Sequence, residues 1–259
     1  ALLRQWRQLG GPSADLEALA DRIAGLPAAG ARLADAGGPP LQFVPAQIGA
    51  SRVQASFALM QREVTRGEYA RFAAATRRDA APCRRRDSLL PSPLRRRWSA
   101  PGFDQQDSEP VVCVSHVDAR AYAEWLSART GARYRLPHLG EWRHAAQAGA
   151  RPSRCGAANL AERDGCRDGV RYTAPANRFA VDALGFADLS GNVAEWIVDC
   201  ARGSGCERHL LAGGSWRESF AQDLRLLVQE AEGQRGYDDV GFRLLREVDA
   251  ESLPARAEP

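Results

Sequence analysis

The sequence predicts an α+β domain with a low content of regular secondary structure. Three segments space their apolar residues as helices do, and short apolar runs typical of strands lie on either side of them. The C-terminal half is rich in glycine and shows little periodicity. Long loops in a compact domain need another constraint, so we expect disulfides or metal ions to hold them.

Local signals place these elements along the chain. Thr65 and Glu68 have the spacing of a capping box, in which each side chain accepts a hydrogen bond from the other residue's backbone N–H. Trp125 and Trp142 lie on the apolar faces of two later helical segments. Helices are therefore predicted at residues 65–76, 117–130 and 139–148, and short strands at residues 41–45, 53–60, 210–212 and 241–245.

We divide the chain into a helical arm and linker at residues 1–38, a main domain at residues 39–248 and a flexible tail at residues 249–259. The arm spaces its apolar residues as a helix between Leu16 and Leu26 and ends in a Gly-Gly-Pro-Pro break. A helix packed on the main domain is the open alternative. No methionine precedes Ala1 and no signal peptide is visible, so we expect an upstream leader or domain, or a trimmed end.

Composition argues against several classes of function. The net charge is +3 with acidic and basic residues interspersed, whereas a nucleic-acid-binding protein concentrates basic residues on one face. No apolar run approaches the roughly 18 residues of a membrane helix. All strongly basic residues are arginine, which excludes a lysine Schiff base. We interpret the arginine runs at residues 84–86 and 95–97 as a solvated loop, because like charges repel, although such runs could bind an anion.

The six cysteines have two interpretations. They are either reduced thiols in a cytosolic protein or three disulfides in an oxidising compartment. No spacing matches a CxxC zinc or redox motif. We favour disulfides, and with them a periplasmic or secreted location, because most of the cysteines lie outside the apolar runs where free core thiols occur. The predicted pairs are Cys155–Cys166, Cys200–Cys206 and Cys83–Cys113.

Several short motifs occur in a fixed order along about four-fifths of the chain. They are Arg62-Glu-Val-Thr-Arg-Gly-Glu-Tyr69, Pro110-Val-Val-Cys-Val-Ser115 with Ala121-Tyr-Ala-Glu-Trp125, Tyr134-Arg-Leu-Pro137 with Glu141-Trp142, the stretch of residues 185–196, Gly213-Gly-Ser-Trp216 and Gly241-Phe-Arg243. Together they resemble the signature of the formylglycine-generating enzymes, or sulfatase-modifying factors. This resemblance over residues 41–246 implies a variant C-type-lectin-like fold.

The resemblance also implies two structural calcium sites. The first would use Asn159, the carbonyl of Leu160, Asp168 and the carbonyl of Val170. The second would use Asp188, the carbonyls of Gly191 and Val193, and Glu195. Calcium binds six to eight oxygens from carboxylates, amides and backbone carbonyls, so both sets offer suitable donors. The alternatives are that Glu195 is a surface carboxylate and Asp188 a turn or cap residue.

The chain departs from the family at the catalytic positions. The oxidase members use two cysteines downstream of Gly-Gly-Ser to bind copper and activate oxygen, and the matching positions here hold Glu218 and Asp223. Carboxylates are hard ligands that bind copper(I) poorly, so we expect neither copper nor formylglycine formation. The surrounding residues, Trp216, Arg217, Glu218, Asp223 and Arg225, are expected to form a mixed-charge binding surface.

Two hypotheses about function remain open. The first is a non-catalytic, extracytoplasmic module that binds an unknown protein or small molecule, as in family members joined to bacterial Ser/Thr kinases or secretion systems. The second is a metal-dependent oxidase- or oxygenase-type maturation enzyme that uses Glu218, Asp223 or a histidine instead of the cysteines. The histidines are scattered along the chain, and spacing alone builds no facial triad from His116, His138, His144 and His209. We favour the binding module.

Overall fold

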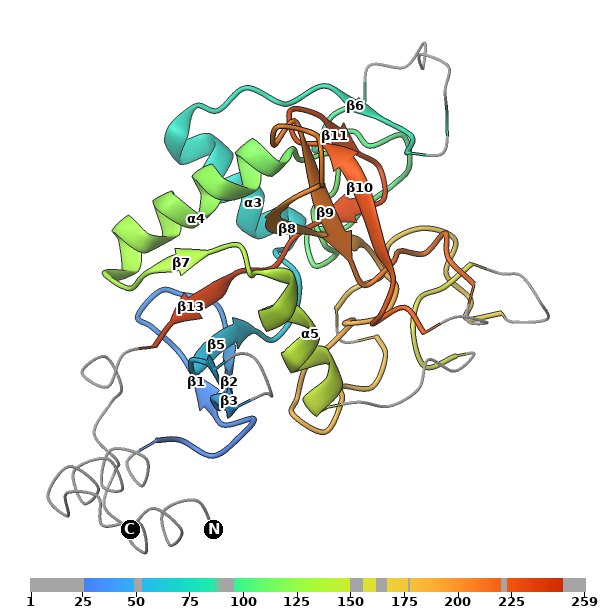
Figure 1. Cartoon of the computed structure of the whole chain (residues 1–259). Helices are drawn as coiled ribbons and strands as arrows, with labels where there is room; N and C mark the ends of the chain where they lie inside the picture. The colour runs from blue at the N-terminus through green and yellow to red at the C-terminus, as the bar shows by residue number, and fades with distance from the viewer. Residues whose placement is uncertain are drawn as a thin grey trace, which may run out of the picture.

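The structure is a computed structural model of the chain, which describes residues 26–48, 53–86, 88, 96–149, 156–161, 167–176, 178–219 and 223–248. These residues contain two larger sheets, two strand pairs and the helices α3 (Arg66–Thr76), α4 (His116–Thr130) and α5 (Leu139–Ala148) (Figure 1). The larger sheets have the strand orders β1-β2-β5-β13-β7 and β10-β9-β8-β12, and the pairs are β11-β6 and β3-β4. Most of the predicted arm, the tail, Cys155 and Cys166 lie outside the described residues.

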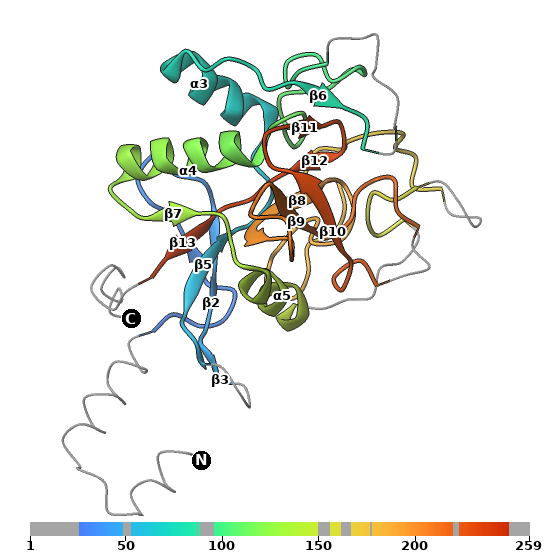
Figure 2. The ribbon, with the colours of Figure 1, turned by 45° about the horizontal axis from the view of Figure 1, so that its top comes forward.

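The five-stranded sheet brings the two ends of the domain together. Strand β13 lies between β5 and β7, so the last strand of the chain pairs with one of the first. All neighbours in this sheet are antiparallel. Figure 2 labels four of its strands, β2, β5, β13 and β7. The strands are β1 (Arg32–Leu33), β2 (Leu41–Val44), β5 (Phe57–Met60), β7 (Tyr134–Arg135) and β13 (Leu245–Glu247).

The predicted helices are confirmed, and local hydrogen bonds explain where they begin. At the start of α3 the Glu68 N–H donates to Thr65 Oγ1 at 3.2 Å, and the Thr65 N–H donates to Glu68 Oε2 at 2.8 Å. Ser115 and Asp118 form a second capping box before α4, which the sequence analysis did not identify. Two orphan donors are satisfied in each box, which fixes the first turn of the helix.

Aromatic packing joins α3 and α4 to the core. Tyr69 and Phe72 of α3 contact each other at a centroid distance of 5.3 Å, and Phe72 is also 5.3 Å from Tyr122 of α4. Tyr122 in turn lies 5.4 Å from Phe242, close to the end of the chain. Burial of each such side chain contributes roughly 1.5–3 kcal/mol, so this cluster holds the helices on the sheet.

The four-stranded sheet contains strands that the sequence analysis missed. It consists of β8 (Ala194–Cys200), β9 (Arg208–Ala212), β10 (Val228–Glu232) and β12 (Val240–Gly241), of which β8 and β10 were not predicted. The predicted Cys200–Cys206 disulfide closes the connection from β8 to β9. The predicted Cys83–Cys113 disulfide is also present and lies beside the pair β6 (Cys83–Arg84) and β11 (Gly236–Tyr237). The remaining pair is β3 (Gln47–Ile48) with β4 (Val53–Gln54).

The described part of the predicted linker packs on the domain. Strand β1 pairs with β2, and Leu33 packs against the core. Asp35 accepts a hydrogen bond from the Tyr134 hydroxyl at 2.6 Å and forms an ion pair with Arg246 at 3.2 Å. Residues 30–35 therefore belong to the folded unit rather than to a free linker.

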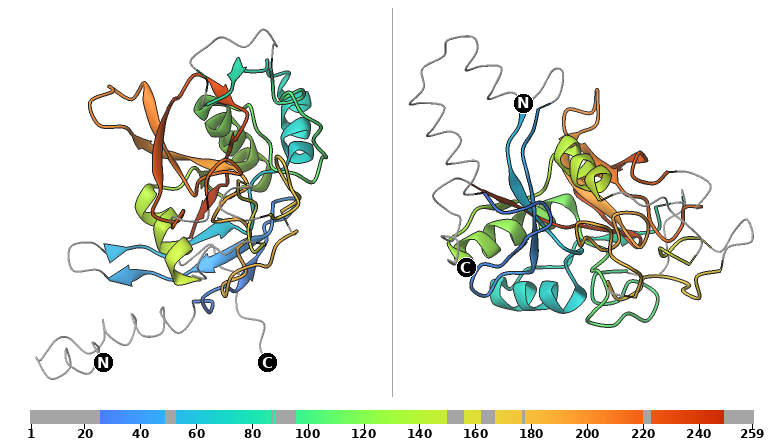
Figure 3. Two further views of the ribbon diagram at one scale, coloured as in Figure 1. Left: turned by 90° about the vertical axis from the view of Figure 1, so that its right-hand side faces the viewer. Right: turned by 90° about the horizontal axis from the view of Figure 1, so that it is seen from below.

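Loops make up a large part of the domain between α5 and β8. Residues 156–161, 167–176 and 178–190 contain neither helix nor strand and are drawn in yellow and orange in Figure 1 and from two further sides in Figure 3. None of the helices in the described part of the chain has the length and apolar character needed to cross a bilayer. The long loops confirm the predicted low content of regular structure.

Candidate functional site

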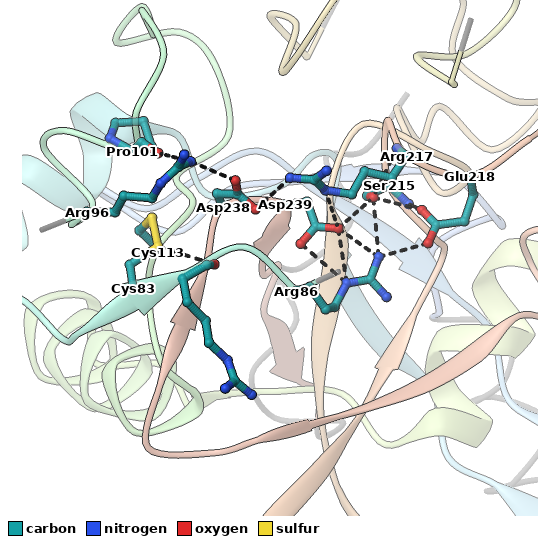
Figure 4. Close-up of polar contacts among 11 residues, drawn as sticks. Cys83, Arg86, Arg96, Pro101, Cys113, Ser215, Arg217, Glu218, Asp238 and Asp239 are labelled. Atoms are coloured by element: carbon teal, nitrogen blue, oxygen red, sulfur yellow. Dashed lines mark hydrogen bonds and ion pairs between the residues drawn. A yellow bond between two sulfur atoms is a disulfide. The ribbon is translucent and has the colours of Figure 1, made fainter. Parts of the chain in front are cut away.

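A network of three arginines and three carboxylates surrounds the Gly-Gly-Ser-Trp segment (Figure 4). Its members come from three parts of the chain: the segment after β6, the turn after β9, and the two residues between β11 and β12. Opposite charges are equal in number, so the cluster is formally neutral. We call it the groove network, and its members are Arg86, Arg96, Arg217, Glu218, Asp238 and Asp239.

Glu218, which the sequence analysis matched to the first family cysteine, is held by several donors. Arg86 Nη2 and Gln229 Nε2 each donate to its Oε1 at 2.8 Å, and the Ser215 N–H and hydroxyl contact its Oε2 at 2.6 and 2.7 Å. Burial raises the pKa of this carboxyl, but Arg86, Gln229 and Ser215 outweigh burial and leave the pKa below its usual value. Glu218 is therefore an ionised, fully engaged acceptor.

Arg86 joins Glu218 to Asp239. Its Nη2 lies 2.7 Å from Asp239 Oδ2, and Asp239 is fully buried. Burial lowers the pKa of Arg86, but Asp239 and Glu218 together raise it above its usual value, so the guanidinium stays charged. The backbone supports this contact, because the Cys83–Cys113 disulfide holds β6 next to β11 and the Asp238 N–H donates to Arg84 O at 3.1 Å.

Asp238 forms the second half of the groove network. Arg96 Nη1 and Arg217 Nη2 each lie 2.9 Å from its carboxylate. Burial raises the pKa of Asp238, and the neighbouring charge of Asp239 adds to this, while the two arginines oppose it. The side chains of Arg86 and Arg96 are only 15% and 13% exposed. The interpretation of the arginine runs as solvated is therefore wrong for these two residues.

An aromatic cluster with an adjoining cleft continues the site. The Arg217 guanidinium lies 4.1 Å from the centre of the Trp216 ring, and Trp216 packs edge-on against Tyr172 at 5.2 Å. Phe103 stacks on Tyr172 at 4.4 Å and lines a cleft of about 540 Å³ together with Arg96. All three rings are half-buried, so part of each side chain remains in contact with solvent.

Asp223 and Arg225 do not join the groove network. Asp223 forms an ion pair with Arg225 at 2.7 Å, and its side chain is 37% exposed. The hydrogen bond from Arg225 lowers the pKa of Asp223. Of the predicted binding residues the structure thus brings Trp216, Arg217 and Glu218 together, and it adds Arg86, Arg96, Ser215, Asp238 and Asp239, which the sequence analysis did not assign to the site.

The four histidines lie in three different places, because two of them stack on each other. His116 and His209 stack with ring centres 3.5 Å apart, and burial lowers the pKa of His116 to about 3. His138 lies 3.3 Å from Asp199, and His144 contacts the carbonyl of Pro45. Among the described residues no three His, Cys, Asp or Glu side chains converge as metal ligands. A histidine iron site has no geometric support in this part of the chain.

The first predicted calcium site has donors that fit a hard cation. Asn159 is fully buried, and its Oδ1 has no hydrogen-bond partner among the described residues. The Asp168 carboxylate accepts from the Leu160 and Val170 N–H groups at 2.6 and 2.8 Å, which places it beside the two backbone positions predicted as ligands. A buried amide oxygen without a donor, and a carboxylate held at the N–H of the next residue, Leu160, suit calcium.

The second predicted site fits in part. Asp188 Oδ2 is a buried atom without a partner among the described residues, but Glu195 is already paired with Arg243 at 2.7 Å and accepts from Trp142 Nε1 at 2.8 Å. Glu195 is only 1% exposed, so it is not a surface carboxylate. Glu63, which the sequence analysis did not assign, is fully buried beside them, and neither of its oxygens has a partner in the described part of the chain.

Known proteins resemble this chain in sequence and in fold. The family described as "Sulfatase-modifying factor enzyme 1-like domain" matches residues 42–248. The formylglycine-generating enzyme of Thermomonospora curvata is 35% identical over 123 residues, which are 39% of this chain and 39% of that protein. The inactive C-alpha-formylglycine-generating enzyme 2 of Bos taurus is 31% identical over 129 residues, which are 44% of this chain and 41% of that protein. The matching segments thus span less than half of each relative.

Solved structures show the same fold. PvdO from Pseudomonas aeruginosa has a TM-score of 0.70 and 25% identity, with 86% of this chain and 100% of that chain covered. CarF has a TM-score of 0.60 and 22% identity over 77% of this chain and 89% of its own. Treponema denticola variable protein 1 has a TM-score of 0.59 and 16% identity over 85% of this chain and 99% of its own. The fold is the one that the sequence motifs implied.

Proposed function

Because the chain belongs to the sulfatase-modifying factor enzyme 1-like domain family, we propose that it is a non-catalytic member of that family which recognises a protein or small-molecule ligand. The proposed binding surface consists of Trp216, Arg217 and the cleft beside Phe103. Asp223 and Arg225, which pair with each other, complete the predicted mixed-charge surface in this proposal. The volume of the cleft, about 540 Å³, is in the range of small-ligand sites.

The environment of Glu218 carries this proposal. Oxidation of a thiol by oxygen needs a group that accepts electrons, and the oxidase members supply it through paired cysteines. Here the first of those positions is an ionised carboxylate whose two oxygens are already engaged by Arg86, Gln229 and Ser215. Such a group offers neither a soft ligand nor a proton to transfer. Its use is to fix the surface around Trp216.

The location and the context of the module are parts of the same proposal. The Cys83–Cys113 and Cys200–Cys206 disulfides support an extracytoplasmic compartment, because reducing compartments keep such thiols free. A position within a larger signalling protein, such as a Ser/Thr kinase, or within a secretion system would suit a recognition module.

Calcium would have a structural role in this module. We propose that Asn159, Asp168 and the carbonyls of Leu160 and Val170 hold one ion. We propose a second ion at Asp188, with the carbonyls of Gly191 and Val193, where Glu195 would have to share its charge with Arg243. A bound ion would tie loops that have few strands or helices to fix them.

The alternative is a metal-dependent oxidase- or oxygenase-type maturation enzyme with replaced residues, and the similarity to the formylglycine-generating enzyme of Thermomonospora curvata supports it. Copper-loaded protein should be incubated under air with a sulfatase-type cysteine peptide, and aldehyde should be measured. We expect no aldehyde above the metal-only control. Turnover above that control would overturn the non-catalytic proposal.

A matched pair of variants sharpens this experiment. The double variant Glu218→Cys/Asp223→Cys restores thiols at the two family positions, and Glu218→Ser/Asp223→Ser changes the same positions without adding thiols. Aldehyde formation by the first variant alone would show that only the cysteines were lost. Stoichiometric iron or copper in the purified wild-type protein would favour the alternative.

A further inference from the structure

Two cavities share part of their lining on α3. The smaller lies between α3, α4 and the loop that precedes β2, and the larger lies between α3, the segment after β5 and the loop that contains Ala176 and Ala187. The smaller has a volume of about 80 Å³ and is lined by Gly37, Tyr122, Trp125 and Arg129, among others. The larger has a volume of about 410 Å³. Glu68 and Arg71 line both cavities. We call the two together the α3–α4 cleft.

Positive charge exceeds negative charge in this cleft. Its lining contains Arg62, Arg71 and Arg129 but only one carboxylate, Glu68. Glu68 is already neutralised, because Arg62 donates to both of its oxygens at 2.7 and 2.8 Å. Neither Arg71 nor Arg129 forms an ion pair in the part of the chain that the structure describes. Two guanidinium groups therefore remain available to a ligand.

A phenol hydroxyl belongs to the same space. Tyr122 is only 3% exposed and lines the smaller cavity, and its hydroxyl makes no hydrogen bond with the described residues. Burial of the ring raises the pKa of this phenol well above its usual value, so the hydroxyl keeps its proton and can donate.

Two neighbours keep Arg129 at the cleft. Its guanidinium lies 4.9 Å from the centre of the Trp125 ring. A Cβ atom added at Gly37 would lie 3.6 Å from Arg129 Nη2, and Gly37 has a φ of +72°, which favours glycine. The arginine thus lies beside both the ring and the loop that line the smaller cavity.

From these contacts we infer that the α3–α4 cleft binds an oxyanion group, with Arg71 and Arg129 as its charge partners and the Tyr122 hydroxyl as a third donor. The smaller cavity has room for roughly two or three waters at about 30 Å³ each, which is the scale of a single carboxylate, phosphate or sulfate group. Arginine suits such groups because its planar fork donates to two oxygens at once. The larger cavity would hold the remainder of the ligand.

Binding of three small probes tests this inference. Inorganic phosphate, sulfate and acetate should be titrated into the whole chain at constant ionic strength, with calorimetry and tryptophan fluorescence as measurements. We expect saturable binding of at least one probe and a fluorescence change that is lost in Trp125→Phe. Binding of phosphate or sulfate without acetate would assign a tetrahedral oxyanion, and binding of acetate alone a carboxylate.

Variants decide whether the cleft is responsible. Arg71→Gln and Arg129→Gln should each weaken binding by at least about tenfold, and Tyr122→Phe by a smaller factor. Arg120→Gln is the matched control, because it removes one exposed arginine from the same helix as Arg129 without touching the cleft. No saturable binding of any probe, or equal binding by all four variants, would overturn the inference.

Discussion

Two clusters of arginines and carboxylates in this chain differ in charge balance and in access to water. In the core cluster one arginine, Arg243, faces the carboxylates of Glu63, Asp188 and Glu195, and Arg243 is fully buried. In the groove network three arginines face three carboxylates, and several of these side chains keep partial contact with solvent.

The difference shows what each cluster requires. The groove network neutralises itself and satisfies Glu218, so it needs no ion or proton to be stable. The core cluster leaves both oxygens of Glu63 and one of Asp188 without a partner among the described residues. A buried excess of negative charge must be reduced by bound protons or by a cation. The core cluster is therefore the place where pH and metal ions should act on stability.

Removal of Arg243 should destabilise the fold more than any other single substitution in the two clusters. Arg243→Met leaves the buried Glu195 without its ion pair and removes the hydrogen bond to the carbonyl of Ala187. We expect a loss of about 3–5 kcal/mol in the free energy of unfolding, measured by urea denaturation. Arg225→Met, which breaks an exposed pair, is the control, and an equal loss in both variants would contradict the comparison.

The pH dependence of stability should come from the core cluster. Burial raises the pKa of Asp188 to about 7, with repulsion from Glu195 adding to the shift, and burial raises that of Glu63 well above its usual value. The folded state therefore binds more protons than the unfolded state between pH 4 and 7. In the presence of chelator, stability should be highest near pH 4 and should fall as the pH rises through 7, by a few kcal/mol.

Addition of calcium distinguishes whether protons or a cation reduce the negative charge of the core cluster. A bound cation favours the ionised carboxylates, so calcium should restore stability at pH 7 and flatten the pH profile. Asp188→Asn should remove most of the slope, and Glu195→Ala should abolish the calcium response at this site. A thermal melting curve at pH 7 that chelator and calcium both leave unmoved would contradict the calcium assignment.

The Cys83–Cys113 disulfide should matter more to the groove network than to the core cluster. Replacement of both cysteines by serine opens a loop with a sequence separation of 30 residues and should cost about 2–4 kcal/mol in the loop-entropy picture. Because β6 carries the chain to Arg86, the loss should also loosen the contact with Glu218. Hydrogen exchange should therefore rise around Ser215 and Glu218 and stay unchanged around Arg243. Uniform protection in the double variant would argue against this coupling.

Local features were predictable from the sequence, and distant pairings were not. The capping box of Thr65 and Glu68 lies within four residues, so the start of α3 follows from a local pattern. Arg86 and Asp239 are 153 residues apart, and no local pattern indicates that they meet. Strand β8 was missed for a related reason, since its partners β9 and β12 follow it along the chain and its first residues belong to a motif interpreted as a calcium loop.

Substitutions at Glu218 and Asp223 should have the smallest effects on stability, and they test whether the groove network contributes more than an ion pair outside it. Glu218→Ala removes a carboxylate that is 10% exposed and leaves Arg86 with Asp239 alone, so we expect a loss of about 1–3 kcal/mol. Asp223→Ala removes only an exposed pair with Arg225, and the loss should stay below about 1 kcal/mol. Urea denaturation of both variants under identical conditions measures the difference. Equal losses would mean that the network around Glu218 contributes no more than a surface ion pair, and the groove would then be open to a different role. A larger loss for Glu218→Ala would show that the Glu218 carboxylate, through its contacts with Arg86, Gln229 and Ser215, contributes to the stability of the fold.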